Sequence, residues 1–273
     1  MAIGYRLRNY EGLRYFFDPD KLGYEVDSLN TDGVTGEVVI PDLIDEYPVV
    51  AIGTAAFAGA RSINSIVIPT GIVTIGGRAF QRSGVESVSF HEGSRLRSIM
   101  ESAFSYTGNL QDIVIPASVV SIGYNAFLHS SIESIGFEED SGLKFMDGAF
   151  AGTRNLRSLT IPARVDTISP GAFWNSSVHT VTFSSGEHLK HIERDAFGNA
   201  RSLRNINLPV GIESIGENAF VGWTLAQTIS VPFVSLARAD AAWAGGGVPG
   251  AWRFGSFAQI VSSISGERLW QFS

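Results

Sequence analysis

The apolar residues of this chain recur with a period of about 23 residues. The dipeptide Ala-Phe occurs eight times, and successive phenylalanines are 23 or 24 residues apart. A fixed period of this length is typical of solenoid proteins, in which each repeat is one small structural unit. We therefore expect one continuous buried column made of Phe57, Phe80, Phe104, Phe127, Phe150, Phe173, Phe197 and Phe220.

Each repeat predicts one short strand with a single buried side. The frame is clearest over residues 110–127, where it is L-x2-I-x-I-P-x2-V-x2-I-G-x2-A-F. Ile113 and Ile115 alternate with Val114, as in a strand with one side on the core. Pro116 follows directly, and proline ends strand pairing because it lacks an N–H. A unit this short cannot bury its own apolar face, so we expect stacked repeats with parallel strands roughly 4.8 Å apart.

A small side chain stands three residues after seven of the eight Ala-Phe dipeptides, and only Trp223 breaks this column. We predict a tight buried site at the corner where the chain turns. An exposed loop of small residues is the alternative. The seven small residues are Ala60, Ser83, Thr107, Ser130, Thr153, Ser176 and Ala200.

Alternate repeats end their strand in phenylalanine, at Phe90, Phe137 and Phe183, and continue into a longer loop. Every second repeat should therefore protrude on the same edge, roughly 10 Å apart. We predict there a mainly acidic ridge that could steer a basic partner, although such charges could also serve only solubility. Its residues are His91, Glu92, Glu138, Glu139, Asp140, Glu187 and His188.

Three large side chains break the repeat in the two places that follow Ala-Phe. Trp174, Leu128 and Tyr106 stand where other repeats have Ala-Gly, Gly-Asn or Val-Gly. Stacking does not require them, so we predict that Trp174 is at least partly exposed and serves as a binding anchor. Packing against the neighbouring turn is the alternative. The outward strand positions are small and polar, which suits shallow contact with a glycan or an extended peptide, or solvation alone.

The frame, together with Val39-Ile40-Pro41 and the segment 47–53, resembles the BspA-like (Treponema pallidum type) leucine-rich repeat family. The resemblance implies a leucine-rich-repeat solenoid that is mainly β, with short parallel strands and irregular or 3-10 turns. About eight repeats would occupy residues 36–232, between an N-terminal capping hairpin region over 1–35 and a C-terminal cap over 233–273. It also implies a bacterial, extracellular or cell-surface protein with a role in adhesion and protein binding.

Both flanks carry the turn chemistry of caps. Asp18-Pro19-Asp20 and the segment 30–33 separate aromatic alternating runs and predict hairpins, the second of them over 24–40. After Pro232 the pattern predicts a helix-like stretch over 235–243, a glycine-rich break over 245–250 and a returning strand over 257–264. Capped ends favour a monomer.

Composition and charge exclude some classes of partner. The 273 residues have a formal net charge of −7, which argues against nucleic acid and anionic membrane surfaces as partners. No apolar run is long enough to insert directly into a membrane, and the first ten residues do not form a signal peptide, so a cytoplasmic location stays open. There is no cysteine.

Catalytic and metal-binding motifs are missing from the sequence. We find no phosphate loop, nucleophile elbow or H-E-x-x-H. The nearest metal-like groups are His188 and His191 with two glutamates, and the acidic run 138–140, which lacks the spacing of calcium loops. We expect no enzyme activity, no cofactor and no metal.

The sequence thus favours a non-catalytic interaction module that binds a protein or glycan through its edge loops and sheet face. Host extracellular matrix is one such partner. The alternative is a rigid structural spacer or stalk segment of a larger surface protein, whose task is to hold another part at a distance.

Overall fold

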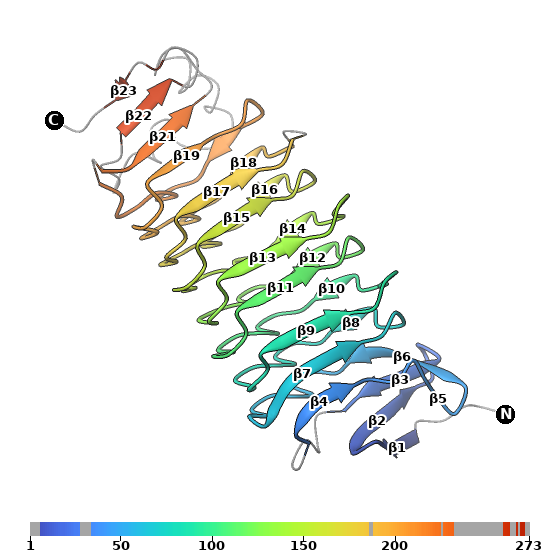
Figure 1. The fold of residues 1–273 in the computed structure, drawn as a ribbon. Helices are drawn as coiled ribbons and strands as arrows, with labels where there is room; N and C mark the ends of the chain where they lie inside the picture. The colour runs from blue at the N-terminus through green and yellow to red at the C-terminus, as the bar shows by residue number, and fades with distance from the viewer. Residues whose placement is uncertain are drawn as a thin grey trace. The chain divides into compact units, whose positions relative to one another are not determined.

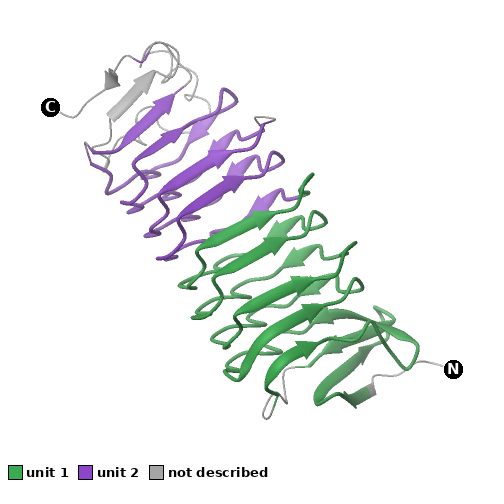
Figure 2. Cartoon of the chain, in the orientation of Figure 1, with its two compact units in different colours: residues 1–142 green, residues 143–273 purple. Residues whose placement is uncertain are grey.

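The computed structural model describes residues 6–27, 34–185, 188–224, 226–231, 259–262, 266 and 268–270. They belong to two compact units, residues 1–142 and residues 143–273 (Figure 2), and each is considered by itself. All regular structure among the described residues is β-strand, and none of it is helix.

One repeat of the sequence makes one rung of a solenoid, and each rung has two strands rather than one. In unit 1, β11 (Asp112–Ile115) is the predicted strand, whereas β12 (Ser121–Ile122) forms later in the same repeat. The prediction of one strand per repeat was therefore wrong. A strand of two residues is too short to show alternation in the sequence. It is recognised by pairing, since Ile99 and Ile122 are parallel partners in neighbouring rungs.

The strands of unit 1 form two sets that stack rung upon rung (Figure 1). In the first set the order is β4-β7-β9, and β11 pairs with β13, all in parallel. In the second set β3 (Gly23–Val26) is followed by β6, β8, β10 and β12. The bounds are β4 (Gly36–Val39), β7 (Ile63–Ile68), β9 (Ser87–Phe90), β13 (Ser134–Phe137), β6 (Tyr47–Ile52), β8 (Thr74–Ile75) and β10 (Ser98–Ile99).

At its N-terminal end, unit 1 begins with antiparallel strands. β1 (Arg6–Tyr10) pairs with β2 (Leu13–Asp18), and β2 pairs with β3 (Gly23–Val26) across the predicted Asp18–Asp20 turn. The hairpin predicted over 24–40 was wrong, because β3 continues into the second set beside β6 and β4 begins the first set beside β7. β5 (Leu43–Ile44) instead makes a hairpin with β6.

Unit 2 repeats the same arrangement. β15 pairs with β17, the short strands follow the order β16-β18-β20, and the last sheet has the order β19-β21-β22-β23. The bounds are β14 (Phe145–Met146), β15 (Ser158–Ile161), β16 (Thr167–Ile168), β17 (Thr180–Phe183), β18 (His191–Ile192), β19 (Asn205–Asn207), β20 (Ser214–Ile215), β21 (Thr228–Val231), β22 (Gln259–Ser262) and β23 (Arg268–Trp270).

The C-terminal predictions fall partly outside the described residues. β22 lies within the strand predicted over 257–264 and is parallel to β21, while β23 is antiparallel to β22. The helix-like stretch predicted over 235–243 and the glycine-rich break over 245–250 are not among the described residues.

The predicted phenylalanine column is buried in full, with a stack of four rings in each unit. All eight Ala-Phe phenylalanines have no solvent exposure. Successive ring centroids from Phe57 to Phe127 are 5.2, 5.0 and 5.4 Å apart. From Phe150 to Phe220 the separations are 5.6, 5.0 and 5.5 Å. The core of each unit is therefore set by one aromatic ring per rung.

The small-residue column is also buried, as predicted, and an exposed loop is excluded. Thr107 and Thr153 each donate their hydroxyl to a backbone carbonyl, of Phe104 and Phe150, at 2.8 Å. At the equivalent place Trp223 is fully buried and donates its Nε1–H to the carbonyl of Phe197 at 2.9 Å.

Candidate functional site

The bend after each Ala-Phe places one residue per rung in the left-handed backbone region. The N–H of that residue points along the stack and donates to the next rung: Tyr106 donates to the Leu128 carbonyl and Asn175 to the Gly198 carbonyl, both at 2.8 Å. We call these eight positions the left-handed row. They are Gly59, Arg82, Tyr106, His129, Gly152, Asn175, Asn199 and Gly222, with φ between 51° and 79°.

Three consecutive rungs of unit 1 carry a large side chain in the left-handed row. The guanidinium carbon of Arg82 lies 5.2 Å from the centroid of the Tyr106 ring, and the His129 ring lies 5.3 Å from it at a tilt of 49°. The Tyr106 side chain is 41% exposed, and Leu128 beside it is half-buried. We call Arg82, Tyr106 and His129 the bend cluster.

Sequence reasoning singled out Tyr106 and Leu128 but missed Arg82 and His129. The signal was present, because both residues occupy the same place in the frame as Tyr106. Glycine or asparagine stands there in all five other rungs. A residue type that departs from this pattern marks a position where stacking alone does not choose the side chain.

Trp174 of unit 2 is partly exposed, as predicted, at 39%. Its ring also packs on the neighbouring turn: a Cβ added to Gly198 would lie only 2.4 Å from the ring atoms Cε3 and Cζ3. The ring is thus partly exposed and also packed on the turn, while its role as a binding anchor stays a prediction. One part of the indole packs on Gly198, and another part is open to solvent.

The residues predicted for the acidic ridge are exposed where they are described, but they lie in both units. In unit 1, His91 and Glu92 follow β9, and Glu138, Glu139 and Asp140 follow β13. One carboxylate is already engaged, because Oε2 of Glu138 accepts the N–H of Ala117 at 2.9 Å.

In unit 2 the same ridge was predicted to include Glu187 and His188. His188 is exposed, whereas Glu187 is outside the described residues. The binding role of the seven ridge residues stays a prediction.

The outward faces of the longer strands are mainly polar, as predicted, but in unit 1 they also carry the exposed side chains of Val39 and Val114. In unit 2 the hydroxyls of Thr160 and Thr182 are 2.9 Å apart on adjacent strands. In unit 1 the Ser134 hydroxyl donates to Asp112 across the same kind of step. Such hydroxyl ladders offer hydrogen bonds but little apolar area.

Comparison with known proteins assigns this architecture to a family. The sequence model described as BspA type leucine rich repeat region (6 copies) matches residues 38–146 and 139–237, which is most of the chain. The chain belongs to the BspA-type leucine-rich repeat family. The resemblance drawn from the repeat frame is thereby confirmed.

Solved structures show the same fold as this BspA-type chain. The pneumococcal vaccine antigen PcpA is similar with a TM-score of 0.59 and 20% identity, over 85% of this chain and 83% of that one. The leucine-rich repeat protein of T. pallidum is similar with a TM-score of 0.53 and 22% identity, over 89% of this chain and 98% of that one. Among curated proteins none matches the sequence.

The described part of this BspA-type chain holds no group of three or more His, Asp or Glu side chains placed to bind a metal ion. His191, one of the predicted candidates, has its Nδ1 2.8 Å from the Ser214 hydroxyl. The same described residues include no helix long and apolar enough to span a membrane.

Shifted pKa values occur at structural contacts rather than at the bends. A hydrogen bond from Lys190 lowers the pKa of the Glu213 carboxyl, and burial raises the pKa of Tyr15. Neither group lies in the left-handed row or in the predicted ridge. These shifts therefore do not mark a catalytic pair.

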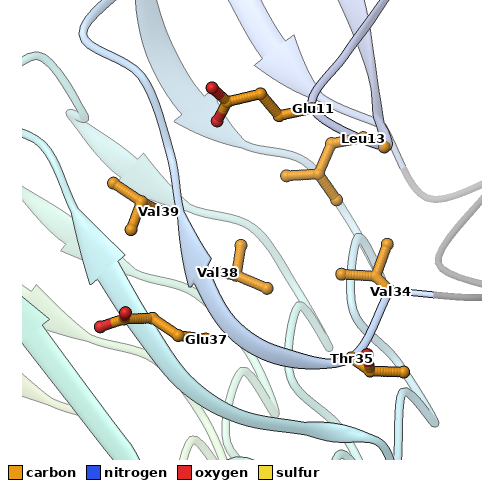
Figure 3. Close-up of a pocket in the computed structure, with 8 residues that line it drawn as sticks. Glu11, Leu13, Val34, Thr35, Glu37, Val38 and Val39 are labelled. Atoms are coloured by element: carbon orange, nitrogen blue, oxygen red, sulfur yellow. The ribbon is translucent and has the colours of Figure 1, made fainter.

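The described residues of unit 1 in this BspA-type chain include the linings of a first and a second hollow. The first has a volume of about 530 Å³, and in it Leu13, Val34 and Val38 face one another, with Glu11 and Glu37 on opposite sides (Figure 3). The second has a volume of about 590 Å³ and lies on the short-strand side. Its lining includes Gly53, Gly76, Val73, Met100 and Lys21.

Proposed function

We propose that this BspA-type chain is a non-catalytic recognition module that binds a protein or glycan ligand outside the cell, through side chains at its bends and edge loops. The rigid rungs hold these side chains at fixed spacing. The chain needs no cofactor for this task, because binding is the whole of the activity.

The single observation that supports the proposal is the bend cluster. A residue other than glycine or asparagine in the left-handed region destabilises the fold by about 1 kcal/mol or more. Unit 1 has Arg82, Tyr106 and His129 there in successive rungs, whereas other rungs have glycine or asparagine at this position, as at Gly59 and Asn175. Left-handed residues other than glycine and asparagine also occur two positions before some of the phenylalanines, at Ala55, Arg78 and Ser102. The bend cluster differs from these because its three side chains are exposed and contact one another.

The residue types of the cluster support recognition as well. Tyrosine, tryptophan and arginine are the side chains that most often dominate binding energy at interfaces. Tyr106 and Trp174 are exposed by 41% and 39%, and each is held in place by neighbours rather than free to rotate. An anchor that is already ordered loses less conformational entropy when a ligand binds.

A surface location belongs to the same proposal. One solved protein of this fold is described as a pneumococcal vaccine antigen, a description that suits a protein accessible from outside the cell. Matrix proteins and glycans are the ligand classes that we propose, because they are accessible to a module outside the cell.

The test is capture of ligands by the immobilised full chain from a panel of extracellular-matrix proteins and purified glycans. Two variants remove the anchors, Tyr106→Asn and Trp174→Ala. Asparagine already occupies the left-handed row at Asn175 and Asn199, so the first variant should fold at least as well as the natural chain. Tyr124→Ser is the matched control, because Tyr124 is 57% exposed and lies outside the left-handed row.

We expect capture of at least one ligand that weakens in either anchor variant and persists in the control. Equal capture by all variants would move the site away from the bends. Failure of the natural chain to retain any ligand would overturn the proposal in favour of a spacer.

A further inference from the structure

Four arginines of unit 2 lie at matching places in two of its rungs. Arg154 and Arg157 form an R-x2-R pair, and Arg201 and Arg204 form a second one 47 residues later. Each pair lies in the segment between the buried small residue of the rung and its longer strand, β15 or β19. We call this the lead-in segment. All four side chains are exposed.

The backbone fixes the spacing of the two pairs. The carbonyl of Arg157 accepts the N–H of His179, and the carbonyl of Arg204 accepts the N–H of Thr228, both at 2.8 Å. β17 lies between β15 and β19 (Figure 1). The two pairs are therefore two rungs, or about 10 Å, apart. His179, also exposed, occupies the equivalent place in the rung between them.

The positive charge of these rungs is not balanced locally. The three rungs contain no aspartate or glutamate in the bends, lead-in segments and longer strands, that is, in residues 150–162, 173–183 and 197–210. Among the described residues none of the four arginines is paired with a carboxylate, whereas Arg194 pairs with Asp195 and Lys190 with Glu213. A chain with a net charge of −7 thus gathers four unpaired cations on one edge.

The strand face beside this edge is polar and has no large apolar side chain among its described outward residues. A protein partner draws most of its binding energy from buried aromatic and apolar anchors, which this face lacks. A charged glycan is instead bound by protein hydroxyl and amide groups, which form hydrogen bonds with its sugar hydroxyls beside the charged contacts. The face offers Ser158, Thr160, Thr180, Thr182, Asn205 and Asn207, all of them exposed.

We infer that the four arginines, which we call the basic edge, bind an anionic polysaccharide, a glycan that carries sulfate or carboxylate groups at regular intervals. The planar guanidinium donates two parallel hydrogen bonds to such an anion. Because the two arginine pairs are held at a fixed spacing, both can contact anionic groups that recur along one polymer chain. The inference rests on the proposed function, since it names a ligand class for a recognition module, but it depends on residues outside the bend cluster.

The probe is dextran sulfate, titrated against the full chain at low and at moderate salt, with uncharged dextran and polyglutamate as comparison polymers. The test variant replaces Arg154, Arg157, Arg201 and Arg204 with glutamine. Its matched control replaces four other exposed arginines with glutamine, so that the same amount of charge is lost. These are Arg61, Arg78, Arg95 and Arg164.

We expect salt-sensitive binding of dextran sulfate that falls by about tenfold or more in the test variant, because several exposed charge contacts are lost together. The control should stay within about twofold of the natural chain. Thermal unfolding should be alike for all three proteins, since none of the replaced side chains is buried.

Three results would overturn the inference: no binding of dextran sulfate, an equal loss in both variants, or tighter binding of polyglutamate, which would indicate an acidic polypeptide instead. Capture of a matrix ligand that is lost in Tyr106→Asn but kept in the test variant would show that the proposed function stands even when this inference fails.

Discussion

The lead-in segments of the two units have the same backbone role but different charge, mixed in unit 1 and basic in unit 2. In unit 1 they carry Arg61, Glu86, Asn109, Gln111 and Glu133, and in unit 2 they carry Arg154, Arg157, His179, Arg201 and Arg204. Both sets precede strands of the same frame. The stacking of rungs therefore does not decide which residue stands there, and the side chains at these places can differ between the units without changing the fold.

The positions that stacking does decide are alike in the two units. Phenylalanine rings stack at separations of 5.0 to 5.4 Å in unit 1 and 5.0 to 5.6 Å in unit 2. The comparison thus separates the chain into a shared scaffold and a variable edge. This division can be tested by changing one part and measuring the other.

The largest effect should come from the shared scaffold. Phe104→Ala in unit 1 and Phe197→Ala in unit 2 each remove a fully buried ring, and each should lower the free energy of unfolding by about 3–5 kcal/mol. Urea unfolding measures this. Phe145→Ala is the control, since that ring is 54% exposed and its loss should have little effect. A much smaller cost in one unit would show that the two scaffolds are not equivalent.

Close approach of neighbouring rungs should give the next effect. A Cβ at Gly76 would lie 2.7 Å from the carbonyl carbon of Gly53, and a Cβ at Gly216 would lie 2.5 Å from the Arg194 nitrogen. Gly76→Ala and Gly216→Ala should each destabilise by about 1–3 kcal/mol. Thermal melting with Gly108→Ala as reference measures the difference, because Gly108 has no atom within 4 Å of an added Cβ. Equal melting of all three proteins would contradict the close-packed rung.

The variable edge can be tested by transfer. Gly108→Arg with Gln111→Arg gives a lead-in segment of unit 1 the R-x2-R spacing of unit 2, and the space around Gly108 admits a side chain. We expect affinity for dextran sulfate to rise by up to about tenfold, since each new exposed charge contact contributes a fraction of that free energy.

Titration at two salt concentrations measures this gain, and Gly108→Gln alone serves as the control. An affinity that does not change would mean that the charge pair is insufficient and that the neighbouring polar face of unit 2 is also required.

The smallest effect concerns the buried column of small residues. The Thr107 hydroxyl donates to a carbonyl, whereas the hydroxyl oxygens of Ser83 in unit 1 and Ser176 in unit 2 have no protein partner. Thr107→Val should therefore destabilise by about 1 kcal/mol. Ser83→Ala and Ser176→Ala should be neutral or slightly stabilising. Chemical denaturation resolves differences of this size, and a clear loss in either serine variant would indicate a hydrogen bond to water.

The repeat period predicts much of this fold. A short repeat with one apolar ring every 23 or 24 residues can bury that ring only by stacking on its neighbours. The short second strands could not be seen, since two residues such as Ser121 and Ile122 show no alternation. The false hairpin over 24–40 has a related cause: turn residues indicate that the chain reverses or crosses, but not which sheet the next strand joins.

The candidate sites were predicted where a residue breaks the frame visibly, as Trp174 and Tyr106 do. Arg82 and His129 were missed because the left-handed row appears only when the glycines and asparagines of all rungs are aligned. The basic edge was missed because its arginines fit the frame without breaking it. The basic edge is recognised only when the lead-in segments of the two units are compared, and it cannot be recognised in a single repeat.

The left-handed row also limits how the molecule can diversify. Each rung offers one outward position whose backbone does not change with the side chain, so new specificities can be acquired without rebuilding the fold. Each departure from glycine or asparagine lowers stability by about 1 kcal/mol or more, against a total of about 5–15 kcal/mol for a typical domain. The chain already carries such residues elsewhere, among them Ala55, Arg78 and Ser102, so few further rungs of the row can be specialised at once. Selection for binding in one such repeat protein should therefore concentrate in a short run of neighbouring rungs, as at Arg82, Tyr106 and His129.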